Sequence, residues 1–122
     1  MKAAVLLVGH GSLTKGFDAA MKKVARDLRK SGRFGAVGCA YLEITRPLIP
    51  AGIDRLIRKG VADIVVLPYF VLSGKHVTRH IPEIVNRLGK KYKNKVKIRL
   101  APYLGYDGGI VAAVKRRIRE AL

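Results

Sequence analysis

ADIVVLPYF, residues 62–70, decides the fold class, because this stretch is almost wholly apolar and short. A strand that is apolar on both faces is typical of a parallel sheet covered by helices on each side. Three further strands are predicted around it, at residues 2–8 (KAAVLLV), 36–42 (AVGCAYL) and 95–101 (KVKIRLA). The last of these alternates between apolar and basic residues, which favours an edge strand with one solvent-facing side.

Helical periodicity follows each predicted strand, with apolar residues on one face and mostly basic residues on the other. The apolar positions are Phe17, Met21, Val24, Ala25 and Leu28; Ile49, Ile53, Leu56 and Ile57; Ile81, Ile84, Val85 and Leu88; and Ile110 or Val111 with Val114 and Ile118. We expect the second helix to run from about residue 47 to residue 59, with Pro47 and Pro50 in its first turn. Asp107 is expected to cap the last helix, whose apolar stripe should face inward.

The order βαβαβαβα predicts an α/β fold, a three-layer sandwich around a four-stranded parallel sheet with right-handed crossovers. The chain has 122 residues and no linker or low-complexity tract, so we expect one domain over residues 1–122. Its single cysteine, Cys39, excludes an intrachain disulfide and suits a reducing cytoplasm. No apolar run has the length of a membrane span, and we expect neither a signal peptide nor membrane association.

Charge is the unusual feature of the composition. Lys and Arg number 25 against 8 Asp and Glu, which gives a formal net charge of +17. Such a field attracts polyanions, and it does not discriminate among nucleic acid, a membrane surface and a small multiply charged substrate. The sequence contains no Walker loop, dinucleotide-binding glycine motif, nucleophile elbow or nucleic-acid-binding signature.

The carboxyl ends of the predicted strands carry the candidate site, because open α/β sheets bind ligands there. GHGS at residues 9–12 follows the first strand, Glu43 follows the second, and VLSGKH at residues 71–76 follows the third. His10, Glu43 and His76 are therefore expected to converge on one edge. Two imidazoles and a carboxylate suit a divalent ion such as Co²⁺, Ni²⁺, Fe²⁺ or Zn²⁺, and their spacing does not fit a closed structural zinc site.

Other residues near this edge have ordinary structural interpretations. His80 is interpreted as a surface residue in the first turn of the third helix, and Cys39 as a buried strand residue. Tyr69, Phe70 and Tyr103 are assigned to the core by default. His10 differs, because a tight turn between two glycines has no need of an imidazole.

These motifs together resemble those of the small CbiX-type sirohydrochlorin chelatases, single-domain relatives of the class II tetrapyrrole chelatases. The motifs are GHGS at 9–12, LE at 42–43 with a proline shortly after, LPYF at 67–70, GKHV at 74–77 and IP at 81–82. The resemblance covers nearly the whole chain. It implies ATP-independent insertion of Co²⁺ (the cobalamin branch) or Ni²⁺ (the methanogenesis-cofactor branch) into sirohydrochlorin. The metal is then a substrate, no cofactor is permanently bound, and the chain pairs as a homodimer.

The resemblance also implies roles for particular residues. His10 and His76 would bind the incoming metal, His10 would accept a proton, and Glu43 would assist metal handling or proton removal. The tetrapyrrole would contact Arg46, Val71, Leu72, Ser73, Gly74, Lys75 and His76. One departure is that the family usually has an acidic residue directly before Ile-Pro, where this sequence has His80.

Two other functions compete with the chelatase. A polycarboxylate tetrapyrrole accounts for the positive charge as a substrate. A basic nucleic-acid-binding module also accounts for the charge, but it leaves the convergence of His10, Glu43 and His76 as a coincidence. A carrier without catalysis would bind metal and tetrapyrrole and show no turnover.

Overall fold

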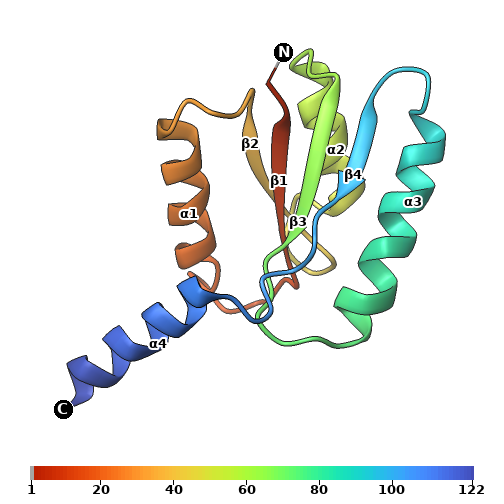
Figure 1. Ribbon diagram of the computed structural model, residues 1–122. Helices are drawn as coiled ribbons and strands as arrows, with labels where there is room; N and C mark the ends of the chain where they lie inside the picture. The colour runs from red at the N-terminus through yellow and green to blue at the C-terminus, as the bar shows by residue number, and fades with distance from the viewer. Residues whose placement is uncertain (1) are drawn as a thin grey trace.

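The computed structural model describes residues 2–122, which form a four-stranded, all-parallel sheet with helices around it (Figure 1). The elements in chain order are β1 (Ala4–Gly9), α1 (Ala19–Lys30), β2 (Val37–Tyr41), α2 (Ile49–Arg58), β3 (Asp63–Pro68), the π-helical turn η1 (His76–His80), α3 (Ile81–Lys91), β4 (Lys97–Leu100) and α4 (Gly108–Ala121). The strand order is β2-β1-β3-β4, so β4 lies at an edge. The α/β fold and the edge position of the fourth strand confirm the predictions from periodicity.

Two apolar clusters hold the layers together. On one face of the sheet, α2 and α3 pack through Ile53 and Ile81 against side chains of β1 and β3 such as Leu6 and Val66. On the other face, α1 packs against β1 and β2 and buries Met21. Both central strands are therefore apolar on both faces, as the stretch at residues 62–70 predicts.

The strand register places the candidate site. β1 pairs with β2 through Gly9 and Tyr41, and with β3 through Val8 and Pro68. Because the three strands are parallel, the segments that leave their carboxyl ends start side by side. The loops at residues 9–12, 42–46 and 69–76 consequently share one edge of the sheet.

The helix ends agree only in part with the sequence. Asp107 caps α4 as predicted, since its carboxylate accepts a 2.7 Å hydrogen bond from the backbone N–H of Gly109. Pro50 lies in the first turn of α2, but Leu48 is the N-cap, so Pro47 precedes the helix and its predicted place inside it is wrong. None of the helices within residues 2–122 is long and apolar enough to cross a membrane.

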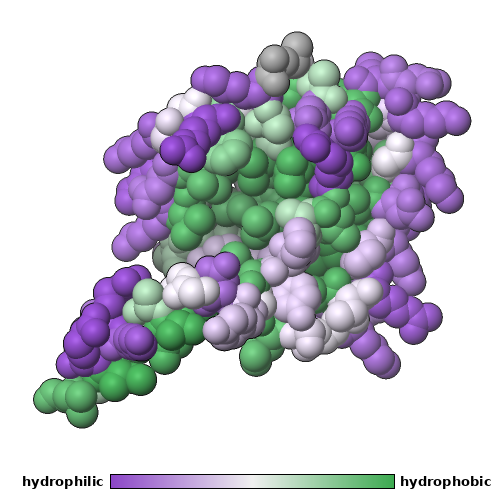
Figure 2. Space-filling view, in the orientation of Figure 1, coloured by the Kyte–Doolittle hydropathy of each residue, from purple (hydrophilic) through white to green (hydrophobic). Residues whose placement is uncertain are grey.

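The last helix departs from the predicted sandwich. α4 extends away from the sheet instead of covering it (Figure 1), and none of its side chains, all in the described part of the chain, is buried. Val114 is 51% exposed and Ile118 is 54% exposed, so the predicted inward stripe is wrong for the single chain. The β3 side chains Val65 and Leu67 are only partly buried, and Figure 2 shows apolar surface over the strands between α1 and α3. The helix and part of one sheet face thus both expose apolar surface.

Candidate metal centre

Backbone hydrogen bonds join the loop after β1 to the loop after β2. The N–H groups of Leu42 and Glu43 donate to the carbonyls of Gly9 and His10, at 3.0 and 3.1 Å. Farther along, the Thr45 hydroxyl accepts from the N–H of Ser12 and donates to its carbonyl, both at 3.0 Å. This pairing continues the sheet beyond the strand ends and fixes the backbones that carry His10 and Glu43.

Two unusual backbone conformations allow this close approach. Gly11 has φ of +108°, and a Cβ there would lie 1.8 Å from the carbonyl oxygen of Glu43, so only glycine fits. Ile44 has φ of +68°, and the Thr45 N–H donates across it to the Glu43 carbonyl at 2.7 Å. A three-residue turn of this hand is strained, above all for a β-branched residue. Strain of this kind is stored where the surrounding structure must hold a functional group in place.

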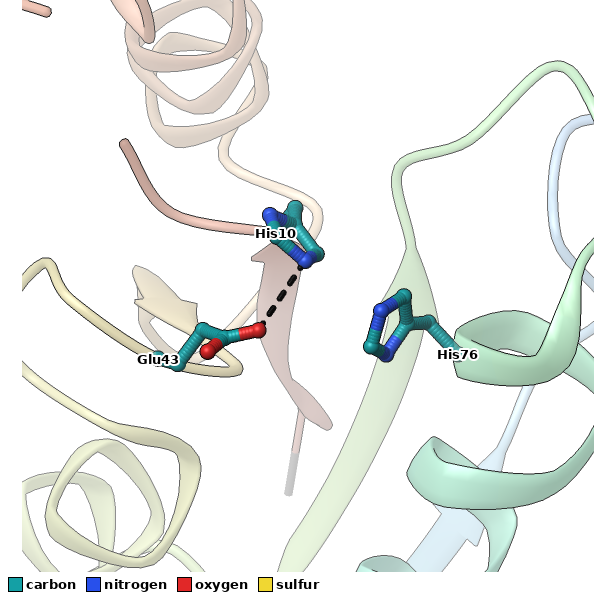
Figure 3. Close-up of side chains that lie close together, drawn as sticks. All are labelled: His10, Glu43 and His76. Atoms are coloured by element: carbon teal, nitrogen blue, oxygen red, sulfur yellow. Dashed lines mark ion pairs between the residues drawn. The ribbon is translucent and has the colours of Figure 1, made fainter. Parts of the chain in front are cut away.

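His10, Glu43 and His76 come together at this edge (Figure 3). One ligand atom from each lies within 4.8 Å of the others, and the His10 and His76 rings meet edge to face at a centroid distance of 4.6 Å. The three residues follow three different strands, His10 and Glu43 on loops and His76 at the start of η1, and the His10 and Glu43 side chains are 42% and 54% exposed. The convergence predicted from topology is therefore present, and it is open enough for a ligand to enter.

The hydrogen bonds of His10 indicate which of its nitrogens is available. Nδ1 lies 3.1 Å from the carbonyl oxygen of Gly11, which only accepts, so Nδ1 carries a hydrogen. Nε2 lies 3.1 Å from Oε1 of Glu43. A second hydrogen between Nε2 and the carboxylate satisfies this contact, and a divalent cation can take its place. This geometry can accommodate either a proton or a divalent metal ion between the two side chains.

Comparison with known proteins places the chain in a family. The CbiX family model matches residues 4–121. The sirohydrochlorin cobaltochelatase of Sulfolobus acidocaldarius is 35% identical over 118 residues, which are 97% of this chain and 91% of that one. The chain belongs to the CbiX family. This confirms the resemblance read from the sequence motifs.

Solved structures of the CbiX family and its relatives share the fold. A CbiX protein from Marinobacter aquaeolei VT8 superposes with a TM-score of 0.82 at 25% identity, over 98% of this chain and 96% of that one. The sirohydrochlorin chelatase SirB from Bacillus subtilis subspecies spizizenii, in complex with cobalt, superposes with a TM-score of 0.87 at 28% identity. This chain covers 51% of that SirB chain, and 38% of the sirohydrochlorin cobaltochelatase of Priestia megaterium. It thus spans about half the length, or less, of these larger relatives.

Of the residues predicted to contact the tetrapyrrole, the segment 71–76 leads directly to the cluster, whereas Arg46 lies apart from it. Residues 71–75 are exposed, and Leu72 is 82% exposed. Leu13 and Ile44, on the other two loops, are 91% and 55% exposed. Arg46 is exposed and lines a separate surface pocket of about 470 Å³ with Arg55, so the structure does not place it against the histidines.

Sequence reasoning missed two features beside the cluster. His80 is not an isolated surface residue, because its Nδ1 lies 3.0 Å from Nδ1 of His76. The four-residue spacing of the two histidines was the available signal, since such pairs share one face of a helical turn. Tyr69, assigned to the core, also lines a cavity of about 200 Å³ together with His10, Phe17 and Asp18.

The Asp18 carboxylate, which lines this cavity, and the buried Tyr41 hydroxyl shift each other's pKa. The Tyr41 hydroxyl donates a short hydrogen bond to Asp18, whose side chain is only 10% exposed. This bond, with support from Lys22, holds the pKa of the Asp18 carboxyl below its usual range. Burial, followed by the same bond, raises the pKa of the Tyr41 hydroxyl. Burial likewise raises the pKa of the Cys39 thiol, which is half-buried in β2.

Proposed function

We propose that this chain inserts a divalent metal, Co²⁺ or Ni²⁺, into sirohydrochlorin without ATP. The observation that carries the proposal is the cluster of His10, Glu43 and His76 at the carboxyl edge of a CbiX-family sheet. Relatives with chelatase names support the substrate: the Sulfolobus protein is a sirohydrochlorin cobaltochelatase, and one from Bacillus subtilis is a sirohydrochlorin ferrochelatase. Imidazole ligands suit Co²⁺ and Ni²⁺ alike.

The cluster offers the two functions that metal insertion requires. The metal must be held by few ligands, so that the four nitrogens of the macrocycle can displace them. The two pyrrole N–H protons must leave as the metal enters, and a base has to stand beside it. We assign the metal to His10 and His76, and proton removal to His10 and Glu43. Once His10 has given up the metal, its Nε2 and Oε1 of Glu43, 3.1 Å apart, can hold a released proton between them.

The exposed loops around the cluster offer a surface for a flat macrocycle with an acidic rim. Leu13, Ile44, Val71 and Leu72 expose apolar side chains on three loops at one edge of the sheet. Such side chains suit the face of a tetrapyrrole, whereas Lys75 and Arg46 suit its carboxylates. We assign substrate contacts to Arg46 and to the segment from Val71 to His76.

We further propose that the chain acts as a homodimer in which two copies correspond to the two halves of longer relatives. The chain covers 51% of SirB, and its α4 exposes an apolar stripe of Val111, Val114 and Ile118, which Leu122 continues just after the helix. A second copy offers the matching surface, because the sheet face between α1 and α3 is also apolar and open (Figure 2). Exchange of α4 would bury both surfaces at once.

Anaerobic absorption spectroscopy tests the reaction directly. Sirohydrochlorin is mixed with Co²⁺, Ni²⁺ or Fe²⁺, with and without protein, and metallation is followed by the change of the macrocycle spectrum. We expect protein-dependent conversion with Co²⁺ or Ni²⁺. His10→Ala should reduce the rate to the protein-free level with an unchanged circular dichroism spectrum, whereas Arg116→Ala, at an exposed position of α4 outside the cluster, should retain the insertion rate.

Other outcomes would contradict the proposal. Spectral shifts upon binding without conversion above the protein-free control would indicate a carrier. Absence of tetrapyrrole binding, combined with tight and salt-dependent binding of nucleic acid, would indicate the nucleic-acid-binding alternative. Wild-type turnover in His10→Ala would remove His10 from the mechanism.

A further inference from the structure

His76 contacts a second imidazole besides that of His10. Nδ1 of His76 lies 3.0 Å from Nδ1 of His80, and the two rings meet at 64° with centroids 4.9 Å apart. Both residues belong to η1, a single π-helical turn that leads directly into α3. Single π-helical turns occur frequently at functional sites. Both side chains are half-buried.

The direction of this hydrogen bond determines whether His76 can bind a metal at the cluster. Of two neutral imidazoles in contact, one donates N–H and the other accepts with a lone pair. If His80 donates, Nδ1 of His76 is the acceptor and its Nε2 carries the hydrogen, so no lone pair is left for a metal. If His76 donates, its Nε2 is the free base. Because Nδ1 is occupied by His80, Nε2 is the nitrogen left for the side where His10 and Glu43 lie (Figure 3).

We propose that His80 is a positioning residue that accepts the Nδ1–H of His76 and thereby holds Nε2 as the metal-binding lone pair. The inference rests on the proposed function, since it assigns His80 to the same metal centre. Metal-ligating histidines nearly always donate their second ring N–H to an acceptor that fixes ring orientation and tautomer. Here the acceptor is a neutral ring, which adds no charge to a site from which the metal has to leave.

The tautomer of His76 tests the proposal in the metal-free protein. Long-range ¹H–¹⁵N NMR spectra distinguish Nδ1–H from Nε2–H imidazole by the ¹⁵N shifts of the ring. We expect Nδ1–H for His76 in the wild type. His80→Ala removes the acceptor, so His76 should shift toward Nε2–H, the form that free imidazole side chains prefer. His80→Asn places its Oδ1 close to the position of the lost Nδ1 and should restore Nδ1–H.

Metal affinity provides the second readout. Titration of metal-free protein with Co²⁺ under nitrogen, followed by visible absorption, should show binding weakened roughly 10- to 100-fold in His80→Ala, the usual effect of losing such a partner. His80→Asn should bind Co²⁺ much more tightly than the alanine variant. Thr78→Ala is the matched control, because Thr78 lies in the same turn and its hydroxyl donates to the Gly74 carbonyl, at 2.9 Å, and not to either histidine. It should leave both the tautomer and the affinity unchanged.

The two readouts separate failure of this inference from failure of the proposed function. An unchanged tautomer and unchanged Co²⁺ affinity in His80→Ala would overturn the role of His80. Equal losses in His80→Ala, His80→Asn and Thr78→Ala would also overturn it, because the effect would then come from the turn. Absence of Co²⁺ binding by the wild type would overturn the metal centre itself, even where His76 shows the expected tautomer.

Discussion

At the scale of single residues, we expect the strained turn at Ile44 to lower the stability of the fold while it holds the backbone of Glu43 in place. Its φ of +68° costs a β-branched residue on the order of 1–3 kcal/mol, and its side chain is 55% exposed and contributes little burial. Ile44→Gly should therefore raise the free energy of unfolding by about 1 kcal/mol, the strain relieved less the backbone entropy of glycine. The same change frees the backbone of Glu43, so metal insertion should slow down.

Urea denaturation and initial rates measure both effects in Ile44→Gly. Leu13→Gly is the control, since Leu13 is 91% exposed on the neighbouring loop and has no positive φ. It should be neutral or slightly destabilising. If Ile44→Gly lowers the free energy of unfolding as much as Leu13→Gly does, the turn at Ile44 stores no strain.

The Tyr41–Asp18 pair predicts how stability depends on pH. The pKa of Asp18 is lower in the folded protein than in the unfolded chain, where it is about 4. The carboxylate therefore adds to the free energy of unfolding above this pH, and the gain is lost as the pH falls through the folded pKa. The pKa of Tyr41 is higher in the folded protein than in the unfolded chain, where it is about 10. The protonated hydroxyl therefore adds fully to the free energy of unfolding below this pH, and the gain is lost as the pH rises above it. Tyr41→Phe should consequently show a smaller alkaline loss of stability than the wild type.

Urea denaturation at pH 8, 10 and 11 measures this difference. Tyr106→Phe is the control, because Tyr106 is 92% exposed and its alkaline loss should match that of the wild type. Deprotonation of the many lysines affects all three proteins equally and cancels in the comparison. If the free energy of unfolding falls equally with pH in Tyr41→Phe and in the wild type, the raised pKa of the Tyr41 hydroxyl is contradicted.

At the scale of elements, the sequence determines the sheet and the site more fully than the last helix. Parallel topology alone places His10, Glu43 and His76 on one edge, because strand ends and loop order follow from periodicity. Periodicity reports that α4 has an apolar face, but it does not report what covers that face. The sequence also does not predict the turn at Ile44, because β-branched residues rarely adopt a positive φ.

The apolar stripe of α4 predicts the association state. Val114→Gln and Ile118→Gln remove apolar surface from a helix that buries none of it within one chain, so they should leave the monomer folded. We expect wild type to sediment as a dimer and the double variant to shift toward monomer with slower metal insertion. Arg116→Gln, on the opposite face of the same helix, should remain dimeric. A wild type that is fully active as a monomer would exclude the homodimer.

At the scale of the whole molecule, the net charge of +17 should act on the two proposed substrates with opposite sign. The field attracts a polycarboxylate tetrapyrrole and repels a divalent metal ion. Salt screens both effects, since the Debye length falls from about 10 Å at 0.1 M to about 3 Å at 1 M. Raising the salt concentration should therefore increase KM for sirohydrochlorin and decrease KM for Co²⁺.

Initial rates in a salt whose anion does not bind Co²⁺ measure these two trends, with each substrate varied in turn. kcat should change little, because at saturation neither substrate has to be drawn to the site. The opposite signs are the internal control: a general effect of salt on the fold would shift both KM values in the same direction. If KM for sirohydrochlorin is independent of salt, the positive charge does not serve to attract this substrate. Binding of other polyanions, nucleic acid first, should then be titrated.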